Sequence, residues 1–287
     1  MLMLAKWVMS GPIPALALAA ILAIVPGFGW ASGAVVALVA LRRNATDAMA
    51  PLIGGLAVAM LVNWTAGDFS QAGLVIAAMA GALVLANSRS LAWALLASSA
   101  VSALFMVLVL NLAPGKIDQM VQIYQPMFDA WLDELKKNDT EGVFNAINVR
   151  SVVIEATAMV VVISSSAALL VARWLQAKLY NPGGFKQEFH NLRLLPVMSA
   201  LLVLVLFVSQ QYQEARVLLP PAIVPLLLAG LALVHGFAGR KPNNGPLLVF
   251  FYIGLVFSAG LGVMLLIAAA IMDSFADFRS RFQKRYE

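Results

Sequence analysis

The sequence predicts an all-α protein, a polytopic transmembrane bundle of about nine helical membrane segments with amphipathic helices on the membrane surface. Of the 287 residues, 62% are hydrophobic and 11% are charged, whereas charged residues make up about 25% of a soluble domain. The apolar residues form long runs, and about 20 residues of such a run cross the hydrocarbon layer. Basic residues fall in short links between the runs, where they orient membrane spans.

The amino-terminal part, residues 1–178, is predicted to form a six-helix membrane unit. Its first apolar run is too long for one span, and the Pro26-Gly27 break divides it. We expect a retained first span, because one lysine precedes it and no well-formed cleavage site follows. The six spans are expected at residues 9–25, 30–41, 48–65, 72–86, 91–112 and 151–175.

Small residues recur at helical spacing in several of these spans, which predicts close helix packing in lipid. Ala15, Ala19 and Ala23 form one such ridge, and a second lies on the last span at Gly254, Ser258 and Gly262. Each ridge has two interpretations, which are internal packing and contact with a partner protein. An alanine-rich chain produces such ridges by chance, which favours internal packing.

Residues 114–150 form the one long polar excursion. Apolar residues recur there at three- and four-residue intervals, which predicts an amphipathic helix that is kinked or divided at Pro126. Acidic residues outnumber basic ones, which favours the outer side of the membrane.

The remainder of the chain is predicted to contain three further membrane segments. Residues 179–193 form a cytoplasmic turn and amphipathic link, in which Phe185 and Phe189 share one face. The extension 194–272 carries spans at 194–209, 217–237 and 247–272, and residues 273–287 form a basic amphipathic tail. Nine crossings put this tail outside, where its basic residues conflict with the positive-inside rule. Either the ninth segment is not a simple crossing or the rule fails there.

Polar residues at the outer ends of the spans form the candidate ligand-binding site. Glu155 is the clearest, because an ionisable group one turn inside a span costs free energy and is usually paired or functional. The alternative is a local ion pair at the interface for Glu155 and simple helix ends for the others. The set comprises Asn63, Trp64, Asp68, Asn111, Asn148, Arg150 and Glu155.

The sequence favours no enzymatic activity. It contains no cysteine and two histidines on separate segments, and it lacks nucleophile, metal-protease and phosphate-loop motifs. We therefore expect no catalytic residues, no metal and no cofactor. The net charge of +5 is explained by membrane orientation, so nucleic acid is not an expected partner.

Short motifs resemble a bacterial family. The link TyrAsnProGlyGlyPhe, the early Pro-Gly break and the ending MetAspSerPheAlaAspPheArg are similar to the YybS-like integral membrane proteins, whose function is unknown. The first six helices of that family are similar to the S components of energy-coupling-factor transporters. The resemblance implies that Ala15, Ala19 and Ala23 contact a coupling subunit, and it leaves the three extra spans without a counterpart.

Two functions remain open at this point. One is an inner-membrane protein that binds a small solute from the outer face for uptake or sensing. The other is a membrane scaffold or assembly factor, embedded in the lipid bilayer, that recruits cytoplasmic or membrane protein partners through the link and the tail. Phe185 and Phe189 are then the partner contacts.

Overall fold

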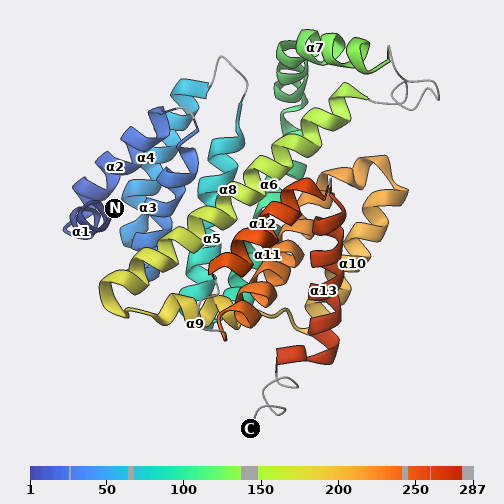
Figure 1. Ribbon diagram of the computed structural model, residues 1–287. Helices are drawn as coiled ribbons and strands as arrows, with labels where there is room; N and C mark the ends of the chain where they lie inside the picture. Colours follow the sequence, from blue (N-terminus) through green and yellow to red (C-terminus); the bar gives the residue numbers. More distant parts are fainter. Residues whose placement is uncertain (26, 64–67, 137–147, 241–244, 259, 280–287) are drawn as a thin grey trace.

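The computed structural model describes residues 1–287 except 26, 64–67, 137–147, 241–244, 259 and 280–287. The regular elements of the described residues are all helical, as predicted (Figure 1). In chain order they are α1 (Leu2–Val8), α2 (Pro12–Ile24), α3 (Gly29–Arg42), α4 (Ala45–Asn63), α5 (Ser70–Ser88), α6 (Leu91–Leu112), α7 (Pro114–Lys136), α8 (Val149–Tyr180), α9 (Gly184–His190), α10 (Pro196–Gln211), the 3-10 helix η2 (Gln213–Leu218), α11 (Leu219–Ala238), α12 (Gly245–Phe257) and α13 (Leu261–Ala276).

Five helical segments are long and apolar enough to cross a membrane, which indicates a multi-pass membrane protein. They are Ala45–Val62, Ser70–Ser88, Leu91–Leu112, Val149–Tyr180 and Gln213–Ala238. The pair α12 and α13 adds a sixth if it counts as one broken span. The prediction of about nine spans is not confirmed, because α2, α3 and α10 have only 13, 14 and 16 residues.

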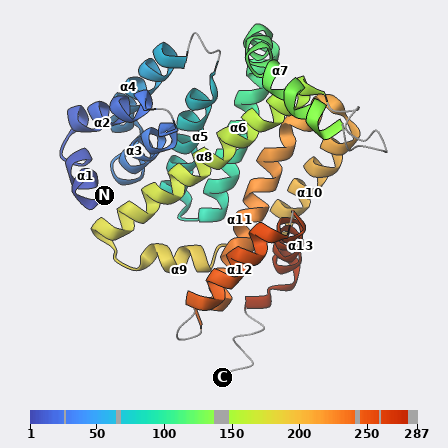
Figure 2. The same cartoon turned by 45° about the horizontal axis from the view of Figure 1, so that its top comes forward.

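Helix α3 is the centre of the amino-terminal bundle. Its residues from Ser32 to Leu41 are all buried, and α2, α4, α5 and α8 pack around it. Helix α8 crosses this bundle diagonally in both views (Figure 2). A short helix such as α3 is therefore shielded from lipid by its neighbours, which is the alternative to crossing the bilayer unaided.

Small residues bring these helices into close contact, as predicted. A Cβ atom added at Gly81 on α5 would lie 2.9 Å from the Ala94 carbonyl oxygen on α6. Ser98 on α6 donates a hydrogen bond to Ser165 on α8 over 3.1 Å. Small side chains thus allow α5, α6 and α8 to pack closely in this part of the bundle.

The first alanine ridge lies inside the molecule. Ala15, Ala19 and Ala23 are 1%, 0% and 2% exposed, on a helix whose most extensive neighbour is α4. This placement agrees with internal packing and leaves these side chains no surface on which to meet a coupling subunit in this conformation. The second ridge does not form on one helix, because Gly254 lies on α12 and Gly262 on α13. A Cβ atom added at Gly254 would have no atom within 4 Å.

The ninth expected span is two helices. Helices α12 and α13 are bent by 118° relative to each other, and Gly260 at the start of α13 has φ +93°, a conformation that favours glycine. Gly262 donates its backbone N–H to the Ser258 hydroxyl over 3.0 Å. The segment therefore folds back on itself, so that α13 ends at the end of the molecule at which α12 begins (Figure 1).

The chain just beyond this hairpin is tied to the link. Arg279, just beyond α13, donates hydrogen bonds of 2.7 Å to the carbonyl oxygens of His190 and Leu192 in the link. Arg193 forms an ion pair with Asp277 at 2.5 Å. The chain just beyond α13 thus lies at the same end of the molecule as α9, opposite α7, which agrees with the alternative that the ninth segment is not a simple crossing.

Candidate functional site

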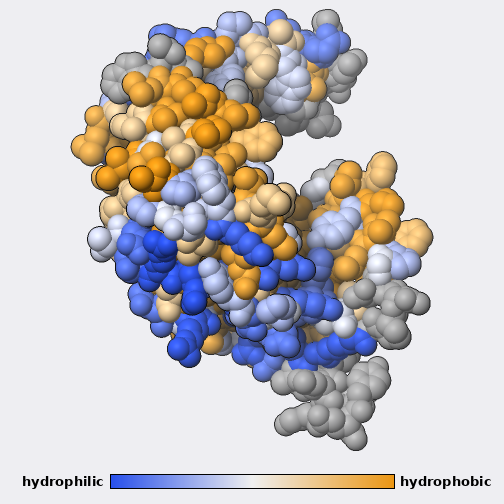
Figure 3. Space-filling model, turned by 90° about the vertical axis from the view of Figure 1, so that its left-hand side faces the viewer, coloured by the Kyte–Doolittle hydropathy of each residue, from blue (hydrophilic) through white to orange (hydrophobic). Residues whose placement is uncertain are grey.

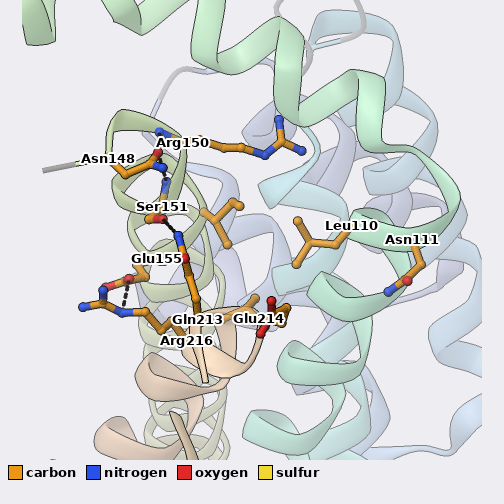
Figure 4. A pocket seen from close by; sticks show the side chains of 11 residues that line it. Leu110, Asn111, Asn148, Arg150, Ser151, Glu155, Gln213, Glu214 and Arg216 are labelled. Carbon is orange, nitrogen blue, oxygen red and sulfur yellow. Dashed lines mark hydrogen bonds and ion pairs between the residues drawn. The ribbon is translucent and has the colours of Figure 1, made fainter. Parts of the chain in front are cut away.

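Four of the predicted residues line one cavity at the α7 end of the molecule, which we call the outer cavity. It has a volume of about 370 Å³ and lies between the end of α6, the start of α8 and η2 (Figure 4). Asn111 comes from α6, whereas Asn148, Arg150 and Glu155 come from α8. Leu110, Ile154 and Val217 form its apolar walls.

The start of α8 is fixed by its own cap. Asn148 accepts hydrogen bonds from the backbone N–H groups of Arg150 and Ser151, at 2.9 and 3.4 Å. Such a cap stabilises a helix start by about 1 kcal/mol. The cap also occupies the Asn148 side-chain oxygen, so helix capping explains in part why an asparagine stands at this position.

Ion pairs tie three elements together around the outer cavity. Glu155 pairs with Arg216 of η2 at 3.0 Å, rather than with its neighbour Arg150. Arg150 instead pairs with Asp118 of α7. Glu155 therefore forms an ion pair, but the pair is not local, because its partner comes from far along the chain.

Sequence reasoning missed the three polar residues that η2 contributes to the outer cavity. Gln213, Glu214 and Arg216 lie in η2, the connection between α10 and α11. Gln213 donates a hydrogen bond to the Ser151 hydroxyl over 3.4 Å. Glu214 is exposed and makes no hydrogen bond or ion pair within the described part of the chain. The signal in the sequence was the charged pair Glu214 and Arg216 between two apolar runs.

Asp68 does not join this cavity. It lines two others, one of about 310 Å³ under α7 and one of about 260 Å³ beside Trp30 and Gln71. Its carboxylate accepts the Ser70 backbone N–H over 2.8 Å and so caps α5. The predicted single vestibule is therefore divided, because the start of α8 stands between the two groups. The Asn63 side chain and Trp64 lie outside the described residues.

The two link phenylalanines pack inward. Phe185 stacks on Phe189, with ring centroids 5.9 Å apart, and the Phe189 ring contacts His235 of α11 edge to face. Phe189 also packs against the main apolar core. These contacts dock α9 onto the bundle and occupy much of the face that the scaffold interpretation requires for partners.

The described residues contain no group of three or more acidic or histidine side chains arranged to hold a metal ion. Comparisons of the chain with protein-family models, curated proteins and solved structures find no match. The resemblance to the YybS-like family therefore stays a prediction.

Proposed function

We propose that this protein binds a small polar solute in the outer cavity, from the outer face of a bacterial inner membrane, for uptake or sensing. The proposed orientation rests on the positive-inside rule. Arg42, Arg89, Arg173 and Arg240 belong to the end of the molecule that carries α9, whereas the acidic helix α7 lies at the other.

The observation that carries this proposal is the convergence of α6, α8 and η2 on one cavity. These elements are far apart in the sequence, and they bring carboxylate, guanidinium and carboxamide groups to apolar walls. Ligand pockets combine apolar walls with a few convergent polar groups, and a volume of about 370 Å³ is near the small end of their range.

The charges favour a solute that carries a cationic group. Both arginines of the cavity already have carboxylate partners, Asp118 and Glu155. Glu214 has none within the described residues, so its carboxylate is the charge that a ligand can neutralise. A zwitterion or amine that pairs with Glu214 and accepts hydrogen bonds from the neighbouring amides fits this arrangement.

The direct experiment is a thermal-stability screen of the purified full chain with amino acids, betaines, polyamines, vitamins, nucleobases and divalent ions. A ligand that binds the folded state raises the unfolding temperature, by an amount that grows with the logarithm of its concentration above the dissociation constant. We expect a cationic or zwitterionic solute to give such a shift, and Glu214→Gln to abolish it.

The matched control is Asp133→Asn, an exposed carboxylate of α7 that does not line the cavity. It is expected to keep the full shift. A panel in which no compound shifts the protein, or in which Asp133→Asn loses the shift as fully as Glu214→Gln, would contradict the proposal.

A further inference from the structure

A second polar cavity lies at the opposite end of the molecule, between the α5–α6 turn and the link. We call it the inner cavity. Its volume is about 440 Å³, and its lining includes two arginines, Arg89 and Arg193, and three carboxamides, Asn181, Gln187 and Asn191. This end carries the hydrophilic side chains that Figure 3 shows across the lower part of its face, below hydrophobic ones.

The charge balance of the inner cavity is positive. Its one lining carboxylate, Glu188, is held by Arg173 through two hydrogen bonds, one of 2.8 Å. Arg193 pairs with Asp277. Arg89 makes no hydrogen bond or ion pair through its side chain among the described residues. An unpaired guanidinium therefore remains, beside amides that can donate hydrogen bonds.

The backbone at Arg89 supplies an independent observation. Arg89 ends α5 with φ +54°, a left-handed conformation that glycine or asparagine adopts at lower cost. Its backbone N–H donates to the Leu85 carbonyl over 2.9 Å, which satisfies the helix end without requiring an arginine. When the side chain of a strained residue makes no contact within the protein, it is a candidate for contact with a bound ligand.

The surroundings favour an amphipathic anion. Residues close in sequence to the lining expose large apolar side chains, which are Trp93 near the start of α6 and Leu195 and Val197 near the start of α10. Trp at this depth is typical of the membrane interface. A headgroup in the inner cavity would therefore lie close to surfaces that suit acyl chains.

We propose that the inner cavity binds the phosphate group of an anionic phospholipid from the cytoplasmic leaflet, through Arg89, Arg193 and the neighbouring carboxamides. Basic pockets at the cytoplasmic ends of membrane helices are suited to such headgroups. The site is independent of the solute proposed for the outer cavity.

The experiment uses the delipidated full chain in neutral detergent, titrated with phosphatidylglycerol, phosphatidylcholine or inorganic phosphate and followed by native mass spectrometry. We expect phosphatidylglycerol to bind more tightly than phosphatidylcholine. Replacing one basic residue, in Arg89→Gln, should weaken that binding about fivefold. The controls Lys178→Gln and Lys186→Gln remove exposed charges at the same end that do not line the cavity, and they should change binding less than twofold.

A second variant separates binding from folding. Arg89→Gly should raise the unfolding temperature, because it relieves the left-handed strain, while it weakens phosphatidylglycerol binding as Arg89→Gln does. Phosphate that binds as tightly as the lipid would support the anion site and identify a soluble phosphate as its source. Equal binding of both lipids, or equal losses in the lysine and Arg89 variants, would overturn the proposal.

Discussion

Helices α3 and α12 are both short and apolar, yet their surroundings are opposite. Helix α3 contains alanine, glycine, serine and valine and is buried from Ser32 to Leu41. Helix α12 carries three phenylalanines and a tyrosine, and it buries no residue. Lipid is as apolar as a leucine side chain, so apolarity alone does not drive helices together in a membrane. Small side chains that permit close contact distinguish the two helices.

The hairpin of α12 and α13 is held through α13, which packs on α11 and buries Leu266 and Ala270. Arg279 bonds the link carbonyls and pairs with Asp273 at 3.4 Å, and Asp273 is 2% exposed. Helix α3, by contrast, is held along its whole length. Four predictions sharpen this comparison, in order of decreasing effect.

Arg279→Gln should cause the largest loss in the free energy of unfolding. It leaves the buried Asp273 carboxylate without its cation, and removing one partner of a buried pair costs about 3 kcal/mol. Unfolding by sodium dodecyl sulfate in mixed micelles would measure this loss. The double variant Arg279→Gln with Asp273→Asn should recover part of it. A single variant as stable as the parent would show that the hairpin is not held at this point.

Leu38→Ala in α3 should cost about 2 kcal/mol, because it leaves a cavity in a close-packed centre. Leu38 is 1% exposed, whereas Phe250 of α12 is 73% exposed. Phe250→Ala, the matched variant, should change the free energy of unfolding by less than about 0.5 kcal/mol. Equal losses in the same detergent assay would break the comparison between the two helices.

Gly230→Ala should cost about 1.5 kcal/mol through overpacking. Its Cβ atom would lie 2.5 Å from the Leu266 carbonyl oxygen of α13, so the hairpin must shift. Gly254→Ala on α12 meets no atom within 4 Å and should be neutral or slightly stabilising. Thermal unfolding of the two variants side by side measures the difference, and a neutral Gly230→Ala would rule out close contact between α11 and α13.

The smallest effect is expected from His190 in the link. Burial, followed by the charge of Lys186, lowers the pKa of His190 below its ordinary value of 6.5, and His235 and Arg279 act in the same direction. Well above pH 6.5 the imidazole is neutral in both states. As pH falls below 6.5 the unfolded chain takes up the proton first, so the folded state loses stability.

The expected change is small because the imidazole is partly exposed. His190→Gln should flatten the dependence of the unfolding temperature on pH between 7 and 5. A steeper dependence in the variant would contradict the direction of this pKa shift.

Much of the fold could be predicted from the sequence. Apolar runs and their polar breaks located most helices, and the amphipathic spacing of residues 114–136 predicted α7, whose Ile117 and Met120 are buried. The division of the ninth segment into two helices, α12 and α13, could not be predicted from its apolar composition. The bend between α12 and α13 lies within an apolar run, and the hydrogen bonds of Arg279 to the link join residues almost 90 positions apart.

The outer cavity could be predicted in part. The end of α6 and the start of α8 were expected on the same side of the membrane, because consecutive spans alternate in direction. This expectation placed Asn111 and Glu155 close together. The charged pair Glu214 and Arg216 indicated a polar connection, but its place beside Glu155 could not be predicted, because it depends on how α10 and α11 pack against α8. Asp68 was misplaced for the same reason, since the sequence does not show on which side of α8 each helix end lies.

The central claim is that the chain returns through α12 and α13, so that Arg279, just beyond α13, lies on the side of the link and opposite to α7. The absence of native cysteine allows single cysteines at Asp133 in α7, Lys186 in the link and Gln283 in the tail to be labelled in intact cells with a reagent that does not cross membranes. The account predicts labelling at position 133 and protection at positions 186 and 283 until the cells are opened. Labelling of 283 together with 133, while 186 stays protected, would contradict it.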